Sequence, residues 1–131
     1  MPRRRPAQVR STDRRAPTVT ARGLPEHTAR ALDLLDQREL HSDRVADALA
    51  AWRTVVQLPV NVLWGPHNDW TEFVGPFART VLDDAVHALD RRTGAPLRAE
   101  LRVLDGEFAR KTSNNPFTDP SLPWWARRWW H

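Results

Sequence analysis

The chain has 131 residues, a mass of 15.1 kDa and a formal net charge of +4, which is the size of one domain and excludes two independent cores. It contains no cysteine, so disulfides, thiolate metal sites and cysteine nucleophiles are excluded. No apolar run approaches the roughly 18 residues of a membrane-spanning helix, and the first 22 residues lack the apolar segment of a secretory signal. We therefore expect a soluble, cytoplasmic protein without a membrane span.

The positive charge is concentrated at the N-terminus. Residues 1–22 carry seven Arg and one Asp, a net of +6, whereas residues 23–131 carry a net of −2. The first segment is poor in large apolar residues, so it cannot bury enough surface to offset the entropy of ordering. We predict a disordered Arg-rich arm over 1–22, a helical domain over 23–112 and a tail over 113–131.

The first predicted helix runs from Pro25 to about Leu40, because proline suits a first turn where its missing N–H has no partner to lose. Only His41 and Ser42 separate it from the next helix, which predicts an antiparallel hairpin with Ser42 as the N-cap. The buried side of the first helix is expected to consist of Ala31, Leu32, Leu34 and Leu35.

The clearest amphipathic helix covers 43–57, and Pro59 prevents it from continuing. Its apolar residues keep the three-four spacing of one helix face: Val45, Ala48, Leu49, Trp52, Val55 and Val56. Trp52 is in the middle of this face and is expected in the core. Asp43 and Asp47 near the start would repel DNA phosphates, which argues against a DNA-reading helix-turn-helix.

Residues 59–69 are predicted to form an ordered loop, pinned to the hairpin by Trp52, Trp64 and Trp70. A capping box formed by Asp69 and Glu72 favours a helix from Trp70, kinked or restarted at Gly75.

The next predicted helix runs from Phe77 to about Arg92 and ends at Gly94. Its inward side chains are expected to be Phe77, Ala78, Val81, Leu82, Ala85, Ala88 and Leu89. Apolar residues then recur at helical spacing over 96–112, namely Leu97, Leu101, Leu104 and Phe108. These elements together predict an all-α protein, a small three- or four-helix bundle.

Catalytic signals are weak throughout. Asp83, Asp84 and His87 have ligand-like spacing on one helix, but we interpret them as a solvated face. There is no glycine-rich phosphate loop and no strained serine elbow. We predict no catalytic residue, metal or cofactor, and therefore a protein that is not an enzyme.

The end of the chain holds the strongest compositional anomaly, with four of the seven Trp in the last eight residues. Exposed indoles form an adhesive patch of a kind that soluble monomers avoid. They therefore cover either the protein's own bundle as a strap, a partner protein, or a nucleic acid or membrane surface. The candidate partner-binding residues are Trp124, Trp125, Arg127, Arg128, Trp129 and Trp130.

The sequence thus predicts a non-enzymatic accessory or adaptor protein that docks to a larger protein through its Trp/Arg-rich tail and an exposed helix face. We expect Phe117 and Leu122 to pack on the bundle, and the final tryptophans to contact another chain. The alternative is sequence-nonspecific association with nucleic acid through the arm. Its candidate residues are Arg3, Arg4, Arg5, Arg10, Arg14 and Arg15.

Overall fold

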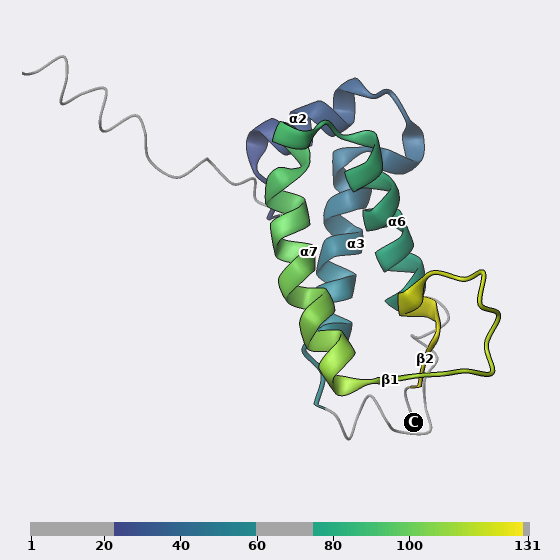
Figure 1. Ribbon diagram of the computed structural model, residues 1–131. Coiled ribbons are helices and arrows are strands. Elements are labelled where there is room, and N and C mark those ends of the chain that lie inside the picture. The colour runs from purple at the N-terminus through teal and green to yellow at the C-terminus, as the bar shows by residue number, and fades with distance from the viewer. Residues whose placement is uncertain (1–22, 60–74, 130–131) are drawn as a thin grey trace, which may run out of the picture.

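Helices build the part of the chain that the computed structural model describes, residues 23–59 and 75–129. These helices are α2 (Glu26–Leu34), α3 (Ser42–Val56), α6 (Gly75–Ala88) and α7 (Arg91–Lys111). Figure 1 shows α3, α6 and α7 side by side, with α2 lying across one end of them. The predicted all-α class and four-helix bundle are confirmed. The arm predicted over 1–22, the loop predicted over 59–69 apart from its first residue, and the helix start predicted at Trp70 lie outside the described residues.

The first helix is shorter than predicted. It ends at Leu34, and Asp36 then takes a left-handed backbone with φ 53°, so the chain leaves the helix there. A short 3₁₀ helix, η1 (Arg38–Leu40), fills the remaining span. The predicted two-residue hairpin joint is therefore wrong, and Leu34, expected inside, is 79% exposed.

The start of α3 is capped from outside its own sequence. Ser42 was predicted as the N-cap, but it is the first helical residue. Its backbone N–H donates to the Asp33 carboxylate at 2.9 Å. The Ser42 hydroxyl donates to the same carboxylate at 3.1 Å. The N-cap is His41, whose Nδ1 accepts from the Asp43 N–H at 3.3 Å. A carboxylate on α2 thus satisfies the first amide of α3.

The boundary between α6 and α7 also differs from the prediction. Asp90 caps α7, because its carboxylate accepts from the Thr93 N–H at 2.8 Å, and this hydrogen bond lowers the pKa of Asp90. Gly94, the predicted stop, is buried in the first turn of α7. The Arg98 guanidinium donates to the carbonyls of Val86 and Arg91 at 3.2 and 3.1 Å, so a cation covers the end of α6 where the helix dipole favours it.

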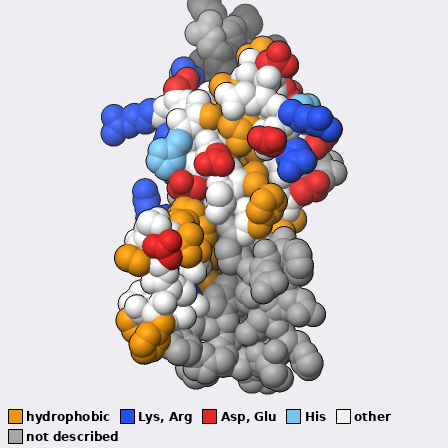
Figure 2. Space-filling view, turned by 90° about the vertical axis from the view of Figure 1, so that its right-hand side faces the viewer, with side chains coloured by type: hydrophobic (Ala, Val, Ile, Leu, Met, Phe, Trp, Pro, Cys, Tyr) orange, Lys and Arg blue, Asp and Glu red, His pale blue; other side chains and the backbone are white. Residues whose placement is uncertain are grey.

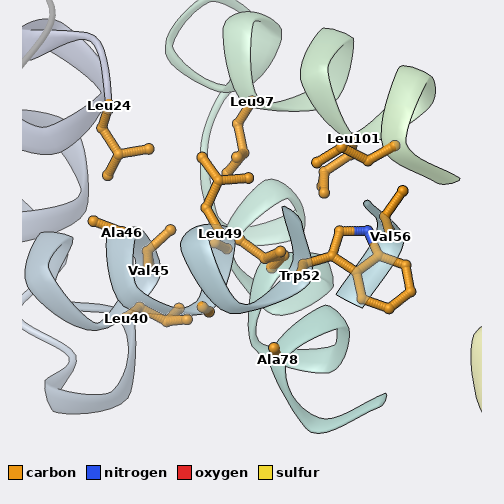
Figure 3. Close-up of a cluster of buried hydrophobic side chains, with 14 of the residues drawn as sticks. Leu24, Leu40, Val45, Ala46, Leu49, Trp52, Val56, Ala78, Leu97 and Leu101 are labelled. Carbon is orange, nitrogen blue, oxygen red and sulfur yellow. The ribbon is translucent and has the colours of Figure 1, made fainter. Parts of the chain in front are cut away.

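Facing leucines of α3 and α7 form the centre of the core. In Figure 3, Leu49 of α3 and Leu97 of α7 point toward one another, and Trp52 lies farther along α3. Trp52 is fully buried, as predicted. The six expected α3 positions and the four expected α7 positions are all buried. Phe77 departs from the prediction, because it is 59% exposed at the start of α6.

Polar contacts join α7 to the other helices across this core. Arg53 of α3 forms an ion pair with Glu100 of α7. Lys111 at the end of α7 donates to the carbonyl of Val56 at 2.6 Å and to that of Leu58 at 3.0 Å. Its ammonium therefore covers the last carbonyls of α3. Together these contacts hold the end of α7 beside the end of α3, where the C-terminal tail begins.

Candidate functional site

The C-terminal tail folds back on the bundle and forms a closed loop. Strand β1 (Ser113–Asn114) pairs antiparallel with β2 (Arg128–Trp129), with Ser113 opposite Trp129. The Asn115 N–H adds a hydrogen bond to the Arg127 carbonyl at 2.8 Å. We call the segment 115–123 the tail loop. The segment that follows it, 124–129, lies on the bundle (Figure 1).

Trp125 anchors this segment on α6. It belongs to the 3₁₀ helix η2 (Trp124–Ala126) and is 6% exposed. The Arg79 guanidinium lies 4.3 Å from the centre of its ring, a cation–π contact in a largely desolvated position. The indole N–H donates to the Thr80 hydroxyl at 3.2 Å, which satisfies its only polar group.

Trp124 extends the aromatic part of the core to the tail. It is half-buried, with its ring 5.9 Å from that of Trp125 and 6.2 Å from that of Phe108. Phe108 in turn lies 4.8 Å from Trp52. These centroid distances are within the range in which aromatic pairs attract one another. The tail aromatics therefore continue the bundle core.

A buried ion pair lies beneath Trp125. The Arg79 Nε and Nη2 donate to the two carboxylate oxygens of Asp105 at 3.0 and 2.8 Å. The Trp52 indole N–H donates to the same carboxylate at 3.1 Å. The third nitrogen of Arg79, Nη1, is buried without a hydrogen bond and lies 3.7 Å from the Asp83 carboxylate. The charge of Arg79 is thus balanced mainly by the Asp105 carboxylate, with that of Asp83 farther away, and is covered by one indole.

Arg128 closes the end of α7. Its guanidinium donates to the carbonyls of Ala109 and Thr112 at 2.9 and 2.8 Å and to the Thr112 hydroxyl at 2.9 Å. Burial lowers the pKa of Arg128, but an arginine remains charged at neutral pH. The cation therefore satisfies carbonyls that the helix leaves without partners. Arg127 is half-buried, and its Nε lacks a hydrogen-bond partner.

The expected packing of Phe117 and Leu122 on the bundle is wrong. Trp125 is buried against the chain's own helices, whereas Phe117 and Leu122, expected to pack on the bundle, are 85% and 41% exposed. The reason is that indole rings pack well against the Arg79 guanidinium and the Phe108 ring. Trp129 is described through its backbone pairing, and Trp130 lies outside the described residues. Binding of a partner by the tryptophan and arginine residues stays a prediction.

The tail loop is shaped by two side chain–backbone turns. The Asn115 side-chain oxygen accepts from the Phe117 N–H at 3.0 Å, and the Thr118 hydroxyl donates to the Asn115 carbonyl at 2.9 Å. The Asp119 carboxylate accepts from the Ser121 N–H at 2.9 Å, and this bond lowers the pKa of Asp119. These are turns that Asn and Asp form readily. They give a short loop a defined shape, with an anionic group two residues after Phe117.

An open hollow of about 310 Å³ lies between α3 and α6. We call it the α3–α6 groove. Small residues from both helices leave the space, and Arg44 and Asp47 of α3 lie at its border as exposed side chains. The lining residues are Arg44, Asp47, Ala48, Ala51, Phe77, Ala78 and Val81.

The polar cluster on α6 is held together by local contacts. His87 is exposed, and its Nδ1 lies 2.8 Å from the Asp83 carbonyl and 3.5 Å from the Asp83 carboxylate. Asp84 borders a separate hollow with His87 and Glu39. Within residues 23–59 and 75–129, no group of three or more His, Asp or Glu side chains is arranged to hold a metal ion. None of the described helices combines the length and apolar character needed to cross a bilayer.

Comparison with known proteins adds no assignment. No protein-family model, no curated protein and no solved structure matches the chain. Any inference about function therefore depends on the chain's own residues. The candidate nucleic-acid residues in the arm lie outside the described residues, so that alternative stays a prediction. Arg79, Asp105 and Asp119 were missed as site residues, because single charges at ordinary helix and loop positions carry no motif.

Proposed function

We propose that this protein is a non-enzymatic accessory protein that docks to a larger protein through its C-terminal tail, with the exposed start of α6 as the helix face. In this proposal the tail loop makes the contact. The segment that follows it, with Trp125 and Arg128, is the anchor that fastens the loop to the bundle.

The observation that carries the proposal is the exposure of Phe117 on a closed loop. A phenyl ring that is 85% exposed loses much contact with water when it enters a partner's pocket. Because the loop is closed by the β1–β2 ladder and shaped by the Asn115 and Asp119 turns, little conformational entropy is lost on binding. Leu122 adds a second exposed apolar side chain on the same loop.

The start of α6 presents a further exposed apolar side chain. Phe77 is exposed there. Trp125 contacts Arg79 and Thr80, which follow Phe77 in α6. Figure 2 shows hydrophobic side chains along the whole described surface on this side, with the acidic and basic side chains mainly in its upper half. A partner with an apolar socket fits the phenyl ring, and a hydrogen-bond donor or cation beside that socket fits the Asp119 carboxylate.

The proposal is tested by capture from the native host with the full-length chain as bait. Phe117→Ser combined with Leu122→Ser is expected to lose specific partners by at least about tenfold, because buried aromatic anchors carry much of the binding energy. The matched control is Leu34→Ser, an exposed apolar residue on α2 at the opposite end of the bundle (Figure 1).

Nuclease treatment and deletion of residues 1–22 separate this function from the nucleic-acid alternative. Partners that survive both treatments and disappear only in the tail-loop variant support the proposal. Capture that is equal in the wild-type, tail-loop and Leu34→Ser proteins contradicts it. Capture that disappears with nuclease or with the arm supports the alternative.

A further inference from the structure

The tail loop and the α3–α6 groove have complementary shapes. An apolar cavity of about 150 Å³ is large enough to hold benzene, so a hollow of about 310 Å³ admits the phenyl ring of Phe117. Its floor consists largely of alanines and Val81, which offer an apolar surface without filling the space. Phe117 does not occupy the groove of its own chain, because it is 85% exposed.

The charges beside the two surfaces are complementary as well. Asp119 follows Phe117 by two residues, and its carboxylate is oriented by the Ser121 N–H. Arg44 borders the groove as an exposed cation. Asp47 borders the groove about one helical turn from Arg44 and disfavours any register that brings Asp119 beside it. Charges at the edge of an interface select the register in this way, because juxtaposed like charges repel one another.

We propose that two copies of the chain associate by exchanging their tail loops, with Phe117 of each copy in the α3–α6 groove of the other and Asp119 beside Arg44 at its border. Both surfaces belong to one chain, so two copies that make both contacts with each other form a closed twofold dimer. The interface is small, and a small interface gives a weak, reversible complex. Association of the copies covers the same loop that the proposed function presents to a partner, but it does not depend on that partner.

Sedimentation velocity on the full-length protein tests the dimer directly. We expect a reversible monomer–dimer equilibrium with a Kd on the order of 10 to 100 μM. Phe117→Ala is expected to weaken it at least about thirtyfold, as the loss of an aromatic anchor does. A wild-type protein that remains monomeric up to about 1 mM overturns the proposal.

Charge reversal tests the loop-to-groove register. Arg44→Glu and Asp119→Arg are each expected to abolish dimers, because each places like charges together at both contacts. An equimolar mixture of these two variants is expected to restore dimers, since opposite charges then meet in both exchanged contacts. Arg102→Glu, at an exposed position of α7, is the matched control and is expected to dimerise as the wild type does.

Failure of the dimer is distinguishable from failure of the proposed function. Arg44 lies outside the tail loop, so Arg44→Glu is expected to remain monomeric and to retain full partner capture. If each variant dimerises alone, or if the mixture stays monomeric while thermal unfolding shows that both chains are folded, the exchange is wrong. If dimers form as expected but capture does not depend on Phe117, the proposed partner function fails and the dimer stands.

Discussion

The guanidinium carbon of Arg79 lies 4.3 Å from the centre of the Trp125 ring, and this contact fastens the end of the described chain to helix α6. Arg79 is itself held in place by Asp105 on α7. One arginine therefore connects two helices and the tail. The loop that carries Phe117 is presented by a segment whose anchor is continuous with the core.

Removal of the indole at 125 is expected to destabilise the whole domain. Trp125→Ala removes a buried ring, its cation–π contact and its hydrogen bond to Thr80, so we expect a loss of about 3 kcal/mol of unfolding free energy. Urea unfolding measures it. Trp124→Ala, at a half-buried position, is the matched control and is expected to cost less. Equal stability of Trp125→Ala and wild type would show that the tail is not anchored through this ring.

The Arg79–Asp105 pair is expected to behave as a coupled unit. Asp105→Leu leaves the Arg79 charge buried and takes the acceptor from the Trp52 N–H, so we expect a loss of about 3 to 5 kcal/mol. Arg79→Met is expected to cost less than that, because Asp105 is partly exposed and keeps the Trp52 hydrogen bond. The double variant is expected to be at least about 2 kcal/mol more stable than the sum of the two single effects predicts. Additive losses in a double-mutant cycle would contradict the coupling.

Acid is expected to weaken the link between α2 and α3. The Ser42 N–H holds the pKa of Asp33 below its usual value of 3.8. The stabilisation is therefore present above pH 3.8 and is lost as the pH falls through the lower pKa of the folded protein. Asp33→Ala is expected to cost about 1 kcal/mol at pH 7, as the loss of a cap does, and the difference from wild type is expected to shrink below pH 3.8.

Unfolding measured as a function of pH checks this expectation for Asp33. The His41 Nε2 lies 3.2 Å from the Asp33 carboxylate, so the comparison is repeated with His41→Asn. The pH dependence of the difference is expected to persist there, because the Ser42 N–H is the largest cause of the shift. A difference between wild type and Asp33→Ala that does not change from pH 7 to pH 2 would be inconsistent with a carboxylate cap.

Polar substitution in the tail loop is expected to leave the fold unchanged. Phe117→Ser and Leu122→Ser alter side chains on the exposed tail loop, so each is expected to change the unfolding free energy by no more than about 0.5 kcal/mol. Thermal unfolding followed by circular dichroism measures it. A large loss of stability would mean that the loop packs on the bundle, as the sequence alone suggests, and would remove the basis for its role in docking.

The amino-acid sequence by itself determined the all-α class and the buried faces of α3 and α7. Residues such as Leu49, Trp52 and Leu101 repeat at helical spacing, and a helix with one apolar stripe has one way to bury it. Helix boundaries were less predictable. Asp33 caps α3 from another helix. Glycine often ends a helix, but Gly94 lies inside α7, which begins after its N-cap Asp90.

Only the tertiary structure decided which part of the tail is buried. Residues 113–129 are interrupted by prolines and have no helical period, so nothing local distinguishes Phe117 from Trp125 as the inward side chain. The choice follows from where the tail meets Arg79 on α6 and Phe108 on α7. Arg79 and Phe108 lie on two different helices, away from the tail along the chain. They become one surface only when these helices pack.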